Sequence, residues 1–448
     1  MVYYQPGIGT YAPPGLLTTV GLKIAEKADE AVAWYLYQHV IDGYKFLMQT
    51  YQAGDSISIF GFSRGAFTAR ALAGMIHSVG LLPSHNVEQI PFAYEVYKRA
   101  KDTNNVKPPS KDAVAPKHDT NNTASSFTAL SPPESDNGNG NIEDVTELDE
   151  ASEFKKTFSL NVDVDFVGVW DTVASVGSFW PRTLPWIDYN PSIRTFRQAL
   201  ALDEHRGSFI PSVWDHRWTV PEKQDVREVW FRGEHSDIGG GAPPESNEEG
   251  ETPYGTSMLS NIPLRWMIRQ IFECQTGILL DPEAVQDLRE ADILEKPPQD
   301  SEKNGGWDWV RRVEESIKLD QNDVERRLYD SFGFNPVWHA LEYFPVAKPC
   351  KNKNFEPRMT RVPNARAGRS IYRTSANDPI FLHSSVLAYL NSKNHYKPRA
   401  KWHGYGNADW PRIEDVLANQ IDAIKQGTFP LQDKTKLEIE RDEDAVGG

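Results

Sequence analysis

The chain has 448 residues, of which 39% are hydrophobic and 25% are charged. This apolar share supports a folded core and excludes a fully disordered chain. The net charge of −15, from 63 acidic and 48 basic residues, argues against a general nucleic-acid binder, which needs clustered Lys and Arg. The two cysteines, Cys274 and Cys350, are too few for a disulfide framework or a Cys-based zinc site.

No apolar run reaches the length of about 18 residues that a membrane-spanning helix needs. The first residues show no basic stretch followed by the apolar core of a secretory signal. Together with the low cysteine count, these features predict a cytoplasmic protein in a reducing compartment.

The first hundred residues alternate between strand and helix patterns. Residues 2–4 read as the end of a buried strand, and residues 21–52 have the three- and four-residue apolar spacing of a long helix. Residues 56–60 are a short β-branched strand, 61–65 a tight turn, and 66–79 a helix rich in small residues. This order is typical of a parallel α/β sheet with flanking helices.

Composition changes at residues 101–155, which are too polar to pack and predict a flexible insertion. Order returns with a strand over 162–170 and a helix over 194–206. A further strand is expected over 226–232 and a further helix over 258–275.

We therefore expect one α/β domain over residues 1–275, then a mainly helical accessory or lid region over 276–432. An acidic flexible tail covers 433–448. The tryptophans of the accessory region fit an ordinary core, with an acyl pocket, a lid or a lipid interface as the alternative: Trp307, Trp309, Trp338 and Trp402.

The strongest local motif is Gly61-Phe62-Ser63-Arg64-Gly65, which fits the G-x-S-x-G nucleophile elbow. In such an elbow the serine occupies a strained strand-to-helix turn, and a Cβ at either glycine is expected to collide with it. The turn aims the N–H of Arg64 at the substrate oxygen, so Arg64 is the predicted oxyanion donor. The alternative is a structural Gly-Ser turn, but a strand before and a helix after the motif favour the elbow.

A nucleophilic serine needs a base. Among eleven histidines, His235 stands out because it directly follows the strand over 226–232, beside a glycine-rich loop. The carboxyl ends of parallel strands are where α/β sheets bind ligands. A loop role for His235 is the alternative, and His383 is the reserve base. His39 and His77 read as helix packing or surface residues, and His205 as a helical residue with local ion pairs.

The base needs an orienting acid. Asp171 ends the strand over 162–170 and gives the chain order Ser63, Asp171, His235 that α/β-hydrolases share. A turn cap is the alternative for Asp171. Asp237 is a competing acid, although it reads better as a loop-fixing side chain. Gly239–Gly241 lacks the spacing and lysine of a nucleotide site.

These motifs together resemble the α/β-hydrolase-like family that includes the phospholipase effectors of type VI secretion and has many fungal members. The resemblance implies an α/β-hydrolase-like fold, a triad on Ser63, Asp171 and His235, and hydrolysis of phospholipids or carboxylic esters. The matching segments are residues 4–10, 59–70, 168–175, 199–204 and 230–241, with a weaker match over 383–399.

The sequence departs from this family at its start. Members begin with an earlier strand that ends in an Asp-Gly-Thr turn, and no such turn precedes Val2. In α/β-hydrolases the second oxyanion N–H comes from a loop near that position, and one such donor contributes about 10²- to 10³-fold in rate. We therefore expect a truncated gene, a fragment or a decayed copy.

The leading hypothesis is a serine hydrolase of esters or phospholipids that uses no metal and no organic cofactor. Its partners would be the ester or phospholipid substrate and a peripheral membrane contact, with no nucleic acid. The first alternative is a catalytically impaired binding or scaffold protein. The second is a metal-dependent phosphohydrolase that uses His235 and Asp237.

Overall fold

The computed structural model describes only part of the chain. The described residues are 1–7, 36–100, 150–173, 184–242, 257–281, 323–334, 339, 342, 343, 345–350, 358–372, 374, 380–383, 385, 386, 389 and 396–403. The tail over 433–448 and the tryptophans Trp307, Trp309 and Trp338 lie outside them, as does most of the predicted insertion.

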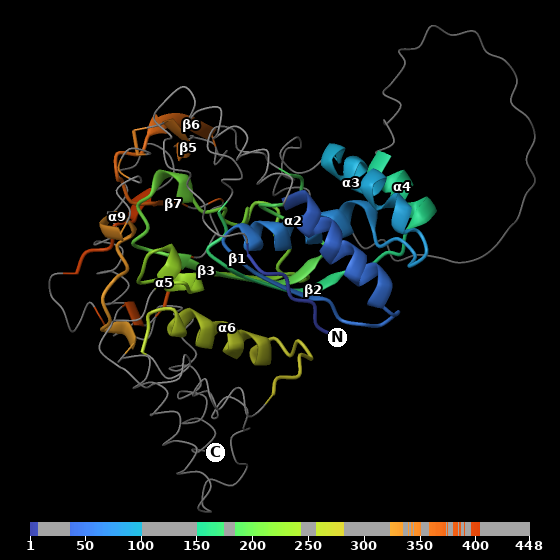
Figure 1. Cartoon of the computed structure of the whole chain (residues 1–448), viewed down its shortest axis with the longest axis horizontal. Helices are drawn as coiled ribbons and strands as arrows, with labels where there is room; N and C mark the ends of the chain where they lie inside the picture. The colour runs from blue at the N-terminus through green and yellow to red at the C-terminus, as the bar shows by residue number, and fades with distance from the viewer. Residues whose placement is uncertain are drawn as a thin grey trace, which may run out of the picture.

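A five-stranded parallel sheet forms the centre of the molecule, with strand order β1-β2-β3-β4-β8 (Figure 1). This confirms the predicted α/β fold with a mostly parallel sheet. The strands are β1 (Ser58–Phe62), β2 (Val164–Trp170), β3 (Ile193–Ala201), β4 (Asp225–Phe231) and β8 (Phe381–Leu382).

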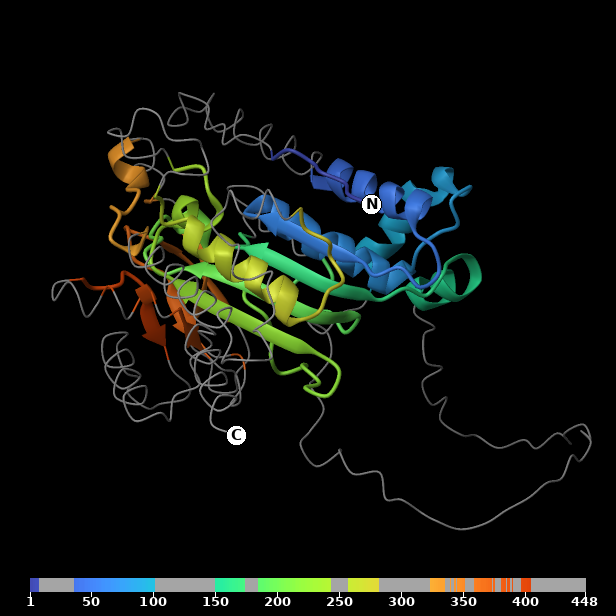
Figure 2. The ribbon, with the colours of Figure 1, turned by 90° about the horizontal axis from the view of Figure 1, so that it is seen from below.

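Helices cover both faces of this sheet, as Figures 1 and 2 show. The residues at 36–50 are helical and lie on one face with three further helices; α6 lies on the other. These helices are α2 (Arg64–Val79), α3 (Ile90–Arg99), α4 (Glu150–Phe158) and α6 (Asn261–Glu273). Among the described residues, no helix has the length and apolar character needed to cross a membrane.

The small side chains of α2 allow it to pack closely. A Cβ at Gly74 would lie 2.9 Å from the Pro185 carbonyl oxygen, so a larger residue there would push the helix away. Ala66, Ala71 and Ala73 are fully buried in the core on this face of the sheet. Close packing of this kind fixes the start of α2, and therefore the turn before it.

Three segments differ from the sequence predictions. Residues 194–206 were expected to be helical, but most of them form the buried strand β3. Its Arg, Gln, Ala and Leu residues favour helices, and pairing on both sides with β2 and β4 overrides that preference. Residues 150–155 belong to α4 rather than to a flexible insertion. Residues 2–4 are exposed and form no strand.

The described part of the region after 281 is also richer in strands than predicted. The antiparallel pair β5 (Pro345–Cys350) and β6 (Arg358–Pro363) and the parallel pair β7 (Ser370–Tyr372) and β9 (Lys401–His403) lie there. The short helix α9 (Ser331–Phe334) lies in this region as well. Strand β8 also extends the central sheet, so the expected domain over residues 1–275 does not include every strand of the sheet.

Candidate active site

Ser63 occupies the tight turn between β1 and α2. Its φ of 59° is in the left-handed region that side chains other than glycine rarely adopt. A Cβ at Gly61 would lie 2.3 Å from the Gly65 carbonyl oxygen, so Gly61 is required as predicted. A Cβ at Gly65 would enter open space, and the expected clash at that position is not found. The turn therefore has the strained geometry that the elbow motif predicts.

Arg64 is the first residue of α2. The first four N–H groups of an α-helix have no acceptor within the helix, and they lie at its positive end. The Arg64 N–H therefore lies at the positive end of α2, directly after Ser63.

Asp171 directly follows β2 and is fully buried. Its φ of 47° is also positive, so the chain turns sharply here. The adjacent strand β3 holds this turn, because the Asp171 N–H donates to the Ala199 carbonyl at 2.8 Å. The Ala201 N–H donates to Asp171 Oδ1 at 2.9 Å.

His235 begins the short helix α5 (His235–Gly239) beyond the carboxyl end of β4. Its Nδ1 lies 2.5 Å from Asp171 Oδ2, and its Nε2 lies 2.7 Å from Ser63 Oγ. The imidazole ring contacts the rings of Phe62 and Phe209, whose centroids lie 4.6 and 4.8 Å away. The structure thus brings together the three residues that the sequence placed after three different strands.

The electrostatics give the two ionisable groups complementary states. Burial alone would raise the pKa of the Asp171 carboxyl, but the Arg369 guanidinium and the His235 ring hold that pKa well below its usual range. Burial lowers the pKa of His235, against the opposing effects of Asp171 and Glu204. At neutral pH, the His235 imidazole is therefore neutral and the Asp171 carboxylate beside it is an anion.

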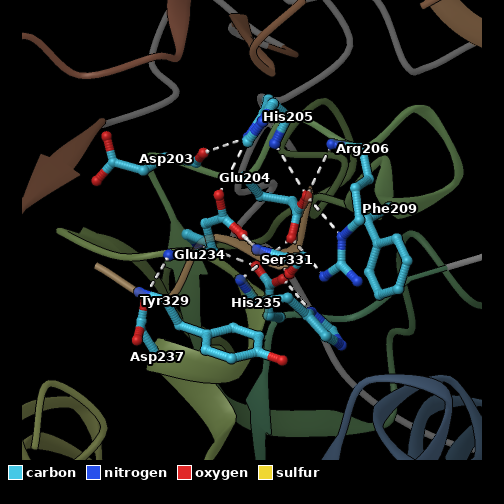
Figure 3. Close-up of polar contacts among 12 residues, drawn as sticks. Asp203, Glu204, His205, Arg206, Phe209, Glu234, His235, Asp237, Tyr329 and Ser331 are labelled. Atoms are coloured by element: carbon cyan, nitrogen blue, oxygen red, sulfur yellow. Dashed lines mark hydrogen bonds and ion pairs between the residues drawn. The ribbon is translucent and has the colours of Figure 1, made fainter. Parts of the chain in front are cut away.

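The two second-tier residues have other roles in the structure. Asp237 caps α5, with Oδ2 accepting the N–H groups of Glu234 at 2.9 Å and Tyr329 at 3.2 Å (Figure 3). Burial raises the pKa of Asp237 to about 7. His383 follows β8, and its ring stacks on Phe231 with centroids 4.6 Å apart. These contacts assign Asp237 to loop geometry and His383 to packing.

A buried carboxylate behind His235 was not singled out from the sequence. Glu204 Oε2 accepts hydrogen bonds from the backbone N–H of His235 at 3.2 Å and from Nη2 of Arg206 at 2.7 Å (Figure 3). Burial would raise the pKa of Glu204, but Arg206 lowers it to about 2. Arg206 in turn lies over the Phe209 ring at 3.5 Å. Glu204 therefore ties the loop after β3 to the backbone of the base.

Glu204, His205 and Glu234 are donors of the kinds that bind metal ions, and their ligand atoms lie within 4.8 Å of one another. Each already has close partners of its own. Glu234 Oε2 accepts the Ser331 N–H and hydroxyl at 3.1 and 2.9 Å, and Arg399 Nη1 lies 2.6 Å from His205 Nδ1. Because guanidinium groups supply the positive charge, this donor set fits an internal ion network rather than a bound cation. His205 lies in the loop after β3, not on the expected helix.

Arg369 is a second residue that sequence reasoning missed. It directly precedes β7, and its Nη1 and Nη2 lie 2.5 and 2.7 Å from Asp171 Oδ1 and Oδ2. No motif surrounds it, and 198 residues separate it from Asp171. Only the folded chain brings the two together.

A second serine–histidine contact lies at the amino end of the same sheet. His77 Nδ1, in the last turn of α2, is 2.6 Å from the hydroxyl of Ser192, which directly precedes β3. The rings of Trp186 and His77 form a T-shaped pair with centroids 4.5 Å apart. This pair gives an internal comparison for the site at the carboxyl end.

Comparison with known proteins finds a yeast relative by sequence and several solved structures, among them two of low similarity. A yeast protein, uncharacterized protein YEL023C of Saccharomyces cerevisiae, is 32% identical over 216 residues. The match covers 46% of this chain and 26% of the yeast protein, so the chain spans about a quarter of that relative's length.

An uncharacterized protein from Pseudomonas aeruginosa has a TM-score of 0.26 and 20% identity, covering 66% of this chain and 36% of that one. The structure of the Tle1 effector bound to the VgrG spike of the type 6 secretion system has a TM-score of 0.23 and 18% identity. It covers 56% of this chain and 42% of that one. Because both scores are low, family membership rests on sequence.

The family model that matches is described as the catalytic domain of the Tle1-like phospholipase effectors of the type VI secretion system. It matches residues 1–270, more than half of the chain, and these residues include all three members of the hydrogen-bonded Ser63–His235–Asp171 arrangement. The chain belongs to the family of Tle1-like phospholipase effector catalytic domains.

Proposed function

We propose that this protein hydrolyses carboxylic ester bonds of phospholipids through a covalent acyl-enzyme on Ser63. The observation that carries the proposal is the continuous hydrogen-bonded row from Ser63 Oγ through His235 to the Asp171 carboxylate. Nucleophile, base and orienting acid in this geometry are what acyl transfer to a serine requires. Membership of a phospholipase family supports a lipid ester as the substrate.

In the proposed reaction, Ser63 Oγ attacks the ester carbonyl carbon while His235 Nε2 takes the hydroxyl proton. The Asp171 carboxylate stabilises the imidazolium that forms. The Arg64 N–H donates to the developing oxyanion. His235 then returns the proton to the leaving alcohol, and water releases the fatty acid by the same steps in reverse. No step uses a metal ion or an organic cofactor.

The substrate lies in a bilayer, so the protein must reach a membrane surface. We propose a peripheral contact, made by a cytoplasmic protein at the membrane face.

The test compares Ser63→Ala with the matched control Ser192→Ala, because both serines contact a histidine at a similar distance. Purified proteins are assayed on short nitrophenyl esters and on phosphatidylcholine vesicles, with the released fatty acid and lysophospholipid identified by mass spectrometry. Ser63→Ala should lower hydrolysis by about 10⁴-fold or more. Ser192→Ala should stay within about twofold of the parent, as expected for a partly buried site away from the chemistry.

Equal hydrolysis by the parent and Ser63→Ala would overturn the proposal. A folded parent that hydrolyses neither substrate would also overturn it, and would favour the binding or scaffold alternative. Chelator-sensitive hydrolysis that does not depend on Ser63 would favour the metal-dependent alternative.

A further inference from the structure

Arg369 reaches the candidate active site from outside the segment that matches the phospholipase family. That match ends at residue 270, whereas Arg369 lies next to β7 in the last third of the chain. Its side chain is 3% exposed and the Asp171 side chain 0%. The last third of the chain therefore supplies a buried charge to the acid of the proposed triad.

The contact is a two-pronged ion pair. Nη1 and Nη2 of Arg369 face the two carboxylate oxygens of Asp171 one to one. Arg–carboxylate pairs of this bidentate kind fix the plane of the carboxylate as well as its charge. Since Asp171 Oδ2 also contacts His235 Nδ1, the plane of the carboxylate bears directly on the direction of the imidazole ring.

Backbone carbonyls hold the guanidinium in place. Arg369 Nε and Nη2 donate to the Phe209 carbonyl at 3.1 and 2.7 Å, and Nη1 donates to the Ala201 carbonyl at 3.2 Å. The Arg369 carbonyl accepts the Lys401 N–H at 2.7 Å, where β7 pairs with β9. The guanidinium is thus fixed from the loop after β3 and from the C-terminal strands together.

The charge of Arg369 also bears on the base. The charged groups that act on His235 are Asp171 after β2 and Glu204 and Arg206 after β3. The two carboxylates stabilise an imidazolium and Arg206 opposes it. Arg369 lies behind Asp171 as the ion-pair partner of that carboxylate. Removal of Arg369 would leave Asp171 a less neutralised anion, which would stabilise the protonated form of His235 more strongly.

We propose that Arg369 is a positioning residue of the active site. Its two Nη groups hold the Asp171 carboxylate in the plane that points His235 Nε2 at Ser63. Its positive charge limits how readily His235 is protonated. This inference rests on the proposed ester hydrolysis by Ser63. It also implies that residues 1–270 alone do not make the complete site.

The test uses Arg369→Gln and Arg369→Lys in the full chain, with Arg265→Gln as the control. Arg265 forms an equally buried ion pair with Asp323, 2.6 Å long with both side chains 5% exposed, away from the triad. The measurements are kcat and KM for a nitrophenyl ester across pH, and the thermal unfolding midpoint of each protein.

For Arg369→Gln we expect kcat to fall about 10- to 100-fold at the optimum pH, because a misplaced base loses reactive geometry. KM should change little, since Arg369 lies behind Asp171. The acid limb of the pH profile should move to higher pH. In Arg369→Lys the acid limb should lie at the same pH as in the parent, because an ammonium keeps the positive charge. The kcat of this variant should stay low, because an ammonium cannot bind both carboxylate oxygens in the geometry of a guanidinium. Arg265→Gln should lower the unfolding midpoint and leave the pH profile unchanged.

A folded Arg369→Gln protein with the parent's kcat and acid limb would overturn the inference. If Arg369→Gln does not fold, Arg369→Lys decides. A kcat equal to that of the parent would show that the bidentate contact is not needed. Each of these two results would overturn the role of Arg369 but leave the proposed function intact, as long as Ser63→Ala remains inactive. Activity that survives Ser63→Ala would instead remove the basis of both proposals.

Discussion

The two ends of the parallel sheet each hold a serine hydroxyl beside a histidine ring. At the carboxyl end, Ser63 Oγ is 2.7 Å from His235 Nε2, and at the amino end Ser192 Oγ is 2.6 Å from His77 Nδ1. Helix α2 connects them, since it begins after Ser63 and contains His77 in its last turn. By distance alone the two pairs are equivalent.

The surroundings of the two histidines separate them. His235 has the Asp171 carboxylate on its second nitrogen, whereas His77 packs against Trp186. Burial and the nearby Lys155 lower the pKa of His77 to about 4, so its ring resists protonation. A base must accept a proton during the reaction, and only His235 has a buried anion placed to stabilise that charge. A serine–histidine distance is therefore not enough to identify a nucleophile.

Replacing Asp171 by Asn should remove this difference between the two histidines, and it should have the largest effect of the variants that test the comparison. The amide keeps the shape of the carboxylate but neither stabilises the imidazolium nor enforces the tautomer, so kcat/KM should fall by about 10³- to 10⁴-fold. Steady-state hydrolysis of a nitrophenyl ester measures this loss, and circular dichroism checks that the variant is folded. A loss below tenfold in a folded variant would mean that the acid contributes little.

The strained elbow is the second feature that sets Ser63 apart, and two glycine variants test it. Gly61→Ala places a Cβ 2.3 Å from the Gly65 carbonyl oxygen and should lower the free energy of unfolding by about 1 to 3 kcal/mol. Gly65→Ala is the matched control, because its Cβ meets open space and should change stability by less than about 0.5 kcal/mol. Urea unfolding of both variants measures the difference. Equal losses would show that the elbow does not depend on Gly61 in particular.

The smallest expected effect concerns His77. Its pKa is about 4 in the folded protein against 6.5 for a free imidazole, so the unfolded chain binds more protons between these values. The stability that comes from keeping His77 neutral is complete above pH 6.5 and is lost as the pH falls toward 4. Between pH 6.5 and 4, the free energy of unfolding should therefore fall in both proteins. The fall should be about 1 to 3 kcal/mol smaller in His77→Asn than in the parent.

Urea unfolding at several pH values between 7 and 4 checks this prediction. The pKa of His216, also lowered by burial to about 4, contributes a similar slope. His216→Asn is thus the control for histidine burial in general. Identical slopes in the parent and His77→Asn would contradict the assigned burial of His77.

The sequence placed Ser63, Asp171 and His235 correctly at the ends of strands, because short buried strands followed by turn residues are local patterns. It predicted helix for β3, since Arg, Gln, Ala and Leu favour helices and the overriding contacts come from two neighbouring strands. The helix α4 was missed because the polar composition before it extended the predicted insertion too far.

Arg369 and Glu204 show what local patterns cannot supply. Glu204 acts through the backbone N–H of His235, 31 residues away, and Arg369 through a carboxylate 198 residues away. Neither residue lies at a fixed sequence distance from the residue that it contacts. Their positions come instead from the packing of whole helices, strands and loops. The three residues of the proposed triad were accessible from the sequence, whereas the groups that contact them from behind were not.

The fifth strand of the sheet has a consequence for how the chain can be divided. β8 pairs with Val229 and Trp230 of β4, although it comes from residues 381–382. A fragment cut after residue 275 would leave that side of β4 without its partner, and its apolar residues would border an open row of N–H and C=O groups. Such edges recruit other chains, so the isolated fragment should aggregate during expression.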